Sequence, residues 1–206
     1  MTKGEMSLDG SVKFFSEFQE LLERMKNDKL FLITLESIVH NIATARSRGG
    51  RVFVLGIGGS AATASHFIND LRKACEVECY APTDNVSELT ARTNDESFDV
   101  FYEKWLTVSN LQRKDVVFIL SVSGGNKETG NSLSLCNAID LASERIKMIV
   151  GIVGKKESYL KKKGLYVLEV PIVNDKMITP YSEAMQSVIL HYIISHSSLQ
   201  MNSIII

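Results

Sequence analysis

Apolar residues recur at helical spacing in two segments near the start of the chain. Between residues 12 and 25 they fall three or four positions apart, and residues 30–45 repeat the pattern. This spacing is typical of an amphipathic helix with one face on a core. The sequence therefore predicts two N-terminal helices ahead of the first strand.

Short apolar runs rich in β-branched residues then alternate with further helical segments. The strand candidates are residues 51–55, 77–82, 115–120, 147–153 and 165–170. The helices expected between and after them are residues 61–74, 96–106, 127–145 and 182–195, with a lysine-rich helix or turn before the last strand. Such alternation is typical of buried parallel strands. We therefore expect an α/β fold, a doubly wound and mainly parallel sheet flanked by helices, in one domain spanning residues 1–206.

Length, charge and cysteine content narrow the class of protein. The chain has 206 residues, and its 23 lysines and arginines nearly cancel its 24 aspartates and glutamates. This balance favours neither a nucleic acid nor a membrane surface as partner. Cys75, Cys79 and Cys136 form no CxxC pair, which fits a reducing compartment. Because the sequence shows neither a signal-peptide pattern nor a stretch approaching about 20 apolar residues, we expect a cytoplasmic protein.

A glycine-rich turn joins the first predicted strand to the helix after it. Gly58, Gly59 and Ser60 leave backbone N–H groups accessible at the helix start, an arrangement that binds anions. The turn has neither the GxGxxG spacing of a dinucleotide site nor the Lys-Ser/Thr of a P-loop, so we expect no nucleotide cofactor. A tight turn without any ligand would account for the same residues.

A second polar segment follows the strand predicted at residues 115–120. Ser121, Ser123 and Asn126 supply two hydroxyls and an amide around two glycines. Hydroxyl and N–H donors suit the oxygen atoms of a phosphate group. Since ligands of parallel α/β sheets bind at the carboxyl ends of strands, the two segments together predict a phosphate site. In the alternative interpretation, Ser123 or Asn126 only caps the next helix.

Four stretches of the sequence resemble the phosphoheptose isomerases, which are SIS-domain proteins. They are GIGGSAATASHFINDL, NVSELTARTND, SVSGGN and TPYSEAMQSVILH, and the resemblance covers most of the chain. It implies a parallel α/β sandwich, a homotetramer, and an aldose–ketose isomerase that converts sedoheptulose 7-phosphate to an aldoheptose 7-phosphate through an enediol. No redox cofactor is expected. The resemblance adds Asn94 and Asp95 to the expected substrate-binding residues.

The resemblance also implies roles for four residues on two helices. His66 and Asp70 match a histidine and a catalytic glutamate of the family, and Glu183 and His191 match a glutamine and a catalytic histidine. We therefore expect Asp70 and His191 as base and acid in either order, Glu183 in substrate binding, and an optional zinc ion at all four. Eight residues of continuous helix rise about 12 Å, too far for both Glu183 and His191 to reach one ion unless the helix bends or two subunits contribute.

Two departures from the family pattern keep other functions open. Asp70 is one methylene shorter than the family's glutamate, and Glu183 replaces its glutamine. A non-catalytic SIS-domain protein that binds a phosphosugar or a protein partner would tolerate both changes. A third interpretation is an isomerase for a ketohexose or arabinose phosphate. In an alternative interpretation, His66 and Asp70 form only a surface hydrogen-bonded pair. Without the resemblance, His191 would be interpreted as a core histidine.

Overall fold

Five parallel strands form the sheet of the computed structural model, which describes residues 8–201. The strands are β1 (Val52–Gly56), β2 (Cys79–Tyr80), β3 (Val116–Ser121), β4 (Ile149–Val153) and β5 (Tyr166–Glu169), in the order β2-β1-β3-β4-β5. Every neighbouring pair is parallel, so the predicted sheet is confirmed. The expectation about a signal peptide concerns the first residues of the chain, and most of these lie outside the described residues.

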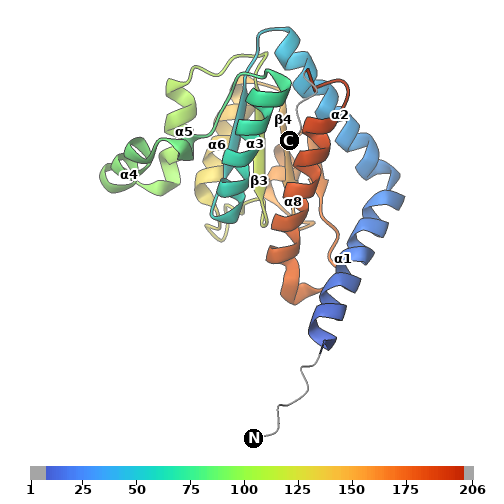
Figure 1. Ribbon diagram of the computed structural model, residues 1–206. Helices are drawn as coiled ribbons and strands as arrows, with labels where there is room; N and C mark the ends of the chain where they lie inside the picture. Colours follow the sequence, from blue (N-terminus) through green and yellow to red (C-terminus); the bar gives the residue numbers. More distant parts are fainter. Residues whose placement is uncertain (1–7, 202–206) are drawn as a thin grey trace, which may run out of the picture.

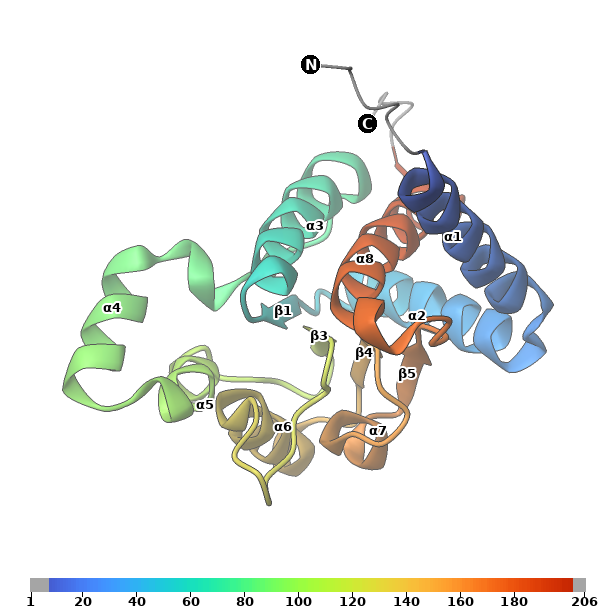
Figure 2. The same ribbon diagram turned by 90° about the horizontal axis from the view of Figure 1, so that it is seen from below.

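Helices cover both faces of the sheet (Figures 1 and 2). On one face lie α1 (Asp9–Asn27), α2 (Lys29–Ser47), α3 (Gly59–Cys75) and α8 (Ile178–Ser195). On the other lie α5 (Phe98–Val108), α6 (Leu133–Arg145) and α7 (Tyr159–Lys163). The two N-terminal helices are thus confirmed. Within residues 8–201, none of the helices combines the length and hydrophobicity that a bilayer span requires.

Alternation along the strands divides the core between the two faces. Val54 and Phe118 pack in the core on one face, whereas Phe53 and Ile119 pack in the core on the other. Successive side chains of a strand point to opposite faces, so a sheet covered on both faces needs apolar residues at every position. This is why the predicted strands are uninterrupted runs of apolar residues in the sequence.

The structure corrects three of the expected boundaries. The helix expected over residues 127–145 starts only at Leu133, because a bridge between Asn126 and Asn131 turns the preceding residues into a small hairpin. The strand expected over residues 77–82 has only two residues. The last helix begins at Ile178, and Pro180 lies in its first turn, where a missing N–H costs no helical hydrogen bond.

One helix was not predicted from the sequence and projects away from the sheet. It is α4 (Val86–Asp95), which starts where the Asn85 side chain accepts a hydrogen bond from the Glu88 N–H and which has no buried residue. Both views show α4 projecting from the sheet next to α5 (Figures 1 and 2). Its few apolar positions gave no helical periodicity to detect.

Helices α3 and α8 pack side by side on the same face of the sheet (Figure 1). The first starts directly after β1, and the second starts in the segment that follows β5, so both begin at the carboxyl edge of the sheet. Residues of their first turns therefore face this edge, and residues further along them lie down the side of the sheet. This arrangement positions the candidate site.

Candidate active site

A cavity of about 280 Å³ lies at the carboxyl ends of β1 and β3. We call it the strand-end cavity; its polar lining includes Ser60, Ser121, Ser123, Ser132, Lys155 and Glu183. Two segments far apart in the sequence, the glycine turn and the serine segment, thus meet here as expected. Gly58 and Gly59 themselves are exposed at the start of α3.

The serine segment is held by hydrogen bonds to its own backbone. Ser121 Oγ accepts from the N–H of Gly124 at 3.0 Å, and Ser123 Oγ accepts from the N–H of Gly125 at 3.3 Å. Both glycines have positive φ, +65° and +79°, a backbone conformation that other residues adopt only with strain. Since each oxygen accepts here, both hydroxyl hydrogens can point to a ligand.

Ser132 completes this cluster, and Asn126 does not. Ser132 lines the cavity, and its Oγ lies 3.4 Å from Ser123 Oγ. The exposed Asn126 side chain instead accepts hydrogen bonds from the N–H groups of Glu128 and Thr129 within the hairpin. The sequence analysis overlooked Ser132, although a serine directly before an apolar helical repeat is a recognised start signal.

Lys155 is the basic residue of the strand-end cavity, and the sequence analysis missed it as well. The preceding residue, Gly154, donates its N–H to the carbonyl of Val122 at 3.0 Å, which ties this loop to the serine segment. A Cβ at Gly154 would lie 2.0 Å from Ser182 Oγ, so only glycine fits. The available signal was that Lys155 lies only two residues after the strand predicted at residues 147–153, where ligands of parallel sheets bind.

Glu183 projects from α8 onto the start of α3. A Cβ at Gly59 would lie 2.5 Å from Glu183 Oε2 and 2.6 Å from Oε1, so the carboxylate lies against this glycine. The N-terminus of a helix carries partial positive charge, which stabilises an anion there. The glycine turn expected to bind phosphate therefore has a carboxylate of the protein beside it.

A buried hydrogen bond lies just below, between the same two helices. Ser60 Oγ donates to Gln186 Oε1 at 3.0 Å, and both side chains are buried. Gln186 Nε2 finds no partner among the described residues. This hydrogen bond fixes the side chain of Ser60, the residue of α3 that lines the strand-end cavity.

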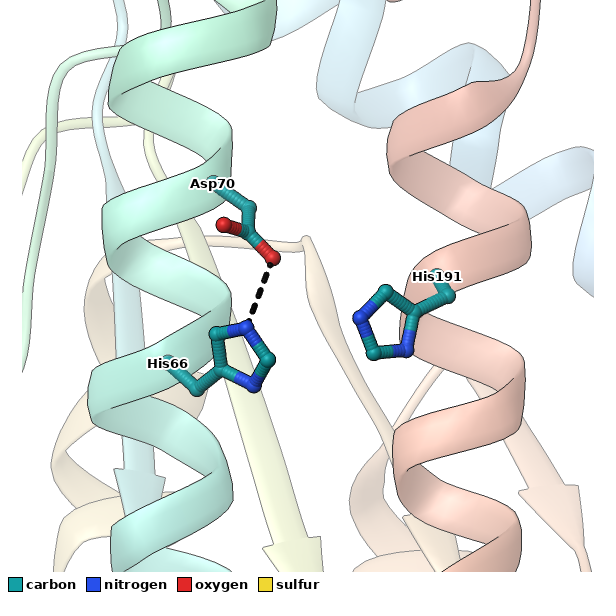
Figure 3. A group of neighbouring side chains, drawn as sticks. All are labelled: His66, Asp70 and His191. Carbon is teal, nitrogen blue, oxygen red and sulfur yellow. Dashed lines mark ion pairs between the residues drawn. The ribbon is translucent and has the colours of Figure 1, made fainter. Parts of the chain in front are cut away.

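His66, Asp70 and His191 lie together further along the same helix pair (Figure 3). His66 Nε2 is 3.2 Å from Asp70 Oδ2, and the rings of His66 and His191 face each other edge to face with centroids 5.2 Å apart. Asp70 is buried, and its Oδ1 accepts from Asn69 Nδ2 at 2.9 Å. The structure thus brings together three of the four residues that the resemblance grouped.

These three residues fit a zinc ion by their chemistry and spacing. One ligand atom from each lies within 4.8 Å of the others, and two imidazoles with a carboxylate are donors that zinc prefers. His191 Nδ1 lies 2.9 Å from the Ser187 carbonyl, which orients the ring and leaves Nε2 for a metal. The cavity beside the group measures about 10 Å³, which is room for one water or ion.

Three of the expected site residues lie away from the group of His66, Asp70 and His191. Glu183 is on the same continuous helix as His191, eight residues away, which corresponds to a rise of about 12 Å. Asn94 and Asp95 lie at the exposed end of α4, where Asn94 Nδ2 donates to Asp95 Oδ1 at 2.8 Å. Neither residue of this pair lines the strand-end cavity.

Comparisons with known proteins identify the family. Residues 13–143 match the family described as SIS domain. The phosphoheptose isomerase of Mycobacterium bovis (strain BCG / Pasteur 1173P2) is 30% identical over 166 residues, covering 77% of this chain and 80% of the relative. That of Syntrophotalea carbinolica is 26% identical over 185 residues, covering 86% of this chain and 87% of the relative.

A solved phosphoheptose isomerase from Francisella tularensis superposes with a TM-score of 0.76 at 21% identity, covering 92% of this chain and 96% of that one. The resemblance seen in the sequence is confirmed, and the chain belongs to the phosphoheptose isomerase family of SIS-domain proteins.

Proposed function

We propose that the protein is an aldose–ketose isomerase that interconverts sedoheptulose 7-phosphate and an aldoheptose 7-phosphate through an enediol. The predicted isomerase function agrees with the names of its relatives, which are phosphoheptose isomerases. One observation carries the proposal: the cavity of serine hydroxyls at the strand ends is followed, along α3 and α8, by a group of protonatable side chains.

Ser121 and Ser123, with Ser132 and Lys155 beside them, are proposed to bind the phosphate group. Their hydroxyls and ammonium are donors for its oxygen atoms, and the lysine offsets its charge. Binding at this end holds the reacting carbons in place, because the energy of a remote contact can be used to orient the reaction centre.

His66, Asp70 and His191 are proposed to act at the other end of the sugar. The rise along α3 from Ser60, which lines the strand-end cavity, to His66 is about 9 Å. An extended chain of six carbon–carbon bonds of roughly 1.5 Å spans about 7.5 Å, so a seven-carbon sugar in the cavity can extend toward this group. Isomerisation moves one hydrogen between adjacent carbons and another between their oxygens, which requires a base and an acid. We assign these roles to Asp70 and His191, in either order.

The proposal includes no redox cofactor, since an aldose and its ketose have the same oxidation level. A zinc ion on His66, Asp70 and His191 would polarise the sugar carbonyl. The side chains of this group, tied to Asn69 and to the Ser187 carbonyl, orient the sugar oxygens and exchange protons with them.

We also propose a homotetramer located in the cytoplasm. The outer face of α1 exposes Val12, Phe15 and Leu22, and Leu8 directly before the helix is exposed as well. Together they form an apolar stripe at helical spacing that a second copy would cover. Helix α4 has no buried residue, which also fits contact with another subunit. All three cysteines are buried and free, as expected in a reducing compartment.

An assay of the purified protein with sedoheptulose 7-phosphate tests the function. The expected result is formation of an aldoheptose 7-phosphate, detected by chromatography with mass spectrometry. Calorimetric binding of the sugar phosphate without turnover would instead favour a non-catalytic SIS-domain protein. Turnover of a ketohexose or arabinose phosphate alone would favour the third interpretation. Both outcomes would contradict the proposal.

A further inference from the structure

Two opposite charges line the strand-end cavity without pairing with each other. Lys155 follows β4, and Glu183 lies near the start of α8. No ion pair found in residues 8–201 includes either side chain. Two other lysines are paired elsewhere: Lys127 with Asp140, and Lys161 with Glu169. The cavity therefore has one available cation and one available anion.

The two charges are attached to different sides of this cavity. The hydrogen bond from Gly154 N–H to the Val122 carbonyl fixes Lys155 beside the serine segment. The contact of the Glu183 carboxylate with Gly59 fixes this anion at the glycine turn. A ligand with a phosphate at one end meets a different charge at each side.

A phosphate group is attracted to only one of these sides. Beside Lys155 it gains an opposite charge together with the hydroxyls of Ser121 and Ser123. At the glycine turn it would meet the Glu183 carboxylate, and like charges at short range repel strongly where water is partly excluded. Sugar hydroxyls, by contrast, are donors that a carboxylate accepts well.

We propose that Lys155 and Glu183 set the direction in which the sugar phosphate binds. Lys155 holds the phosphate at the serine segment, and Glu183 keeps phosphate away from the glycine turn while accepting hydrogen bonds from sugar hydroxyls. The inference rests on the proposed function for its substrate class, and it assigns two specificity-determining residues. It also gives the replacement of the family's glutamine by Glu183 a role, namely the exclusion of a second anion site.

Binding of inorganic phosphate, measured by calorimetry on the intact protein, tests the inference without any turnover. We expect Lys155→Met to weaken phosphate binding by about tenfold or more, as for loss of a charge-assisted contact. Glu183→Gln, which keeps the side chain's shape, should tighten it by about threefold or more, because a repulsive charge is removed. Lys162→Met is the matched control, since Lys162 lies in the same lysine-rich region and lines a different cavity; phosphate binding should not change.

The steady-state KM for the sugar phosphate is a second measurement. In Glu183→Gln, the affinities for the sugar phosphate and for inorganic phosphate should change in opposite directions. Glu183→Gln should raise the KM for the sugar phosphate while it tightens inorganic phosphate, a combination that simple loss of structure does not produce. Weaker phosphate binding in Glu183→Gln, or an unchanged affinity in Lys155→Met, would overturn the inference. The double variant Ser121→Ala/Ser123→Ala separates the cases. If it weakens phosphate and Lys155→Met does not, only the inference fails; if neither does, the proposed phosphate site itself is wrong.

Discussion

Glu17 on α1 accepts a hydrogen bond from the hydroxyl of Tyr181 on α8, although 164 positions separate the two residues. Asn174 Nδ2 also donates to both Glu17 carboxylate oxygens at 3.0 Å. This carboxylate therefore fastens the N-terminal helix to the segment that leads into α8, the helix that carries Glu183 and His191. The N-terminal helices thus help to position the site.

The Glu17 contact predicts a pH-dependent contribution to stability. The hydrogen bond from Tyr181, and then that from Asn174, lowers the pKa of Glu17 from its ordinary 4.5. A lowered folded-state pKa means that the stabilisation is present above 4.5 and is lost as the pH falls through the folded value. Glu17→Gln should therefore lower the urea midpoint near neutral pH, and the difference from wild type should shrink in acid.

Glu20→Gln serves as the control for this effect. Glu20 lies on the same helix in an exposed ion pair with Arg24, and such pairs contribute little. Its midpoint should track that of the wild type at each pH. A Glu17→Gln deficit of the same size in acid as at neutral pH would contradict the role of the carboxylate charge.

Replacing Ser121 and Ser123 by alanine should weaken binding of the sugar phosphate. Each hydroxyl contributes about 0.5–1.5 kcal/mol net, somewhat more to a charged ligand, so the double variant should lose roughly tenfold in affinity or more. Ser143→Ala on α6, where the hydroxyl only bonds back to the Ile139 carbonyl, is the control. An unchanged Kd in the double variant, measured by calorimetry, would place the phosphate elsewhere.

The parallel sheet was predictable because the pattern that produces it lies within short stretches of sequence. A strand buried on both faces needs apolar side chains throughout, as in β1 and β3, and each then ends in glycine or serine. These two strand ends lie together because β1 and β3 are parallel and are neighbours in the sheet. The sequence therefore predicted that Ser60, Ser121 and Ser123 lie at the same edge of the sheet, and they line one cavity there.

The remaining site residues depend on the path of the chain through loops and between helices. Asn126, which was expected at the phosphate site, does not line the strand-end cavity, because the hairpin that ends at Asn131 carries it away and brings Ser132 in. The contact between Glu183 and Gly59 joins positions more than a hundred residues apart, and no local pattern encodes it. The separation of Glu183 from His191, by contrast, follows from helix geometry and was visible beforehand.

Asp70→Asn should abolish most of the turnover while leaving the fold intact. The amide keeps the size of the carboxylate, but it cannot take a proton and holds the His66 ring more weakly. We expect kcat to fall by about a hundredfold or more, with little change in inorganic phosphate binding, since Asp70 does not line the strand-end cavity. Asp99→Asn, at an exposed position of α5, should retain activity. A kcat within a few-fold of wild type would show that Asp70 is not involved.

Light scattering at micromolar concentration should give the mass of four chains of 22.9 kDa each. Phe15 on the exposed face of α1 is 70% accessible, so Phe15→Lys should dissociate the assembly by placing a charge in the apolar contact. Val108→Lys, at an equally exposed apolar residue of α5, should leave the mass unchanged. A monomeric wild-type protein would refute the tetramer and the role proposed for the α1 face.

Metal analysis of protein purified without a histidine tag tests the zinc prediction. We expect up to one zinc ion per chain, held by His66, Asp70 and His191, because their ligand atoms lie within 4.8 Å of one another. His191→Ala should lose the ion, since zinc seldom stays on two protein ligands. His196→Ala is the matched control: His196 follows the same helix but pairs with Glu36. Glu183→Gln should also keep the ion, because Glu183 lies about 12 Å from His191 toward the start of α8. Less than about a tenth of an equivalent in the wild type after zinc loading, with activity indifferent to chelator, would rule the ion out, and the three side chains would then act as a hydrogen-bonded group alone.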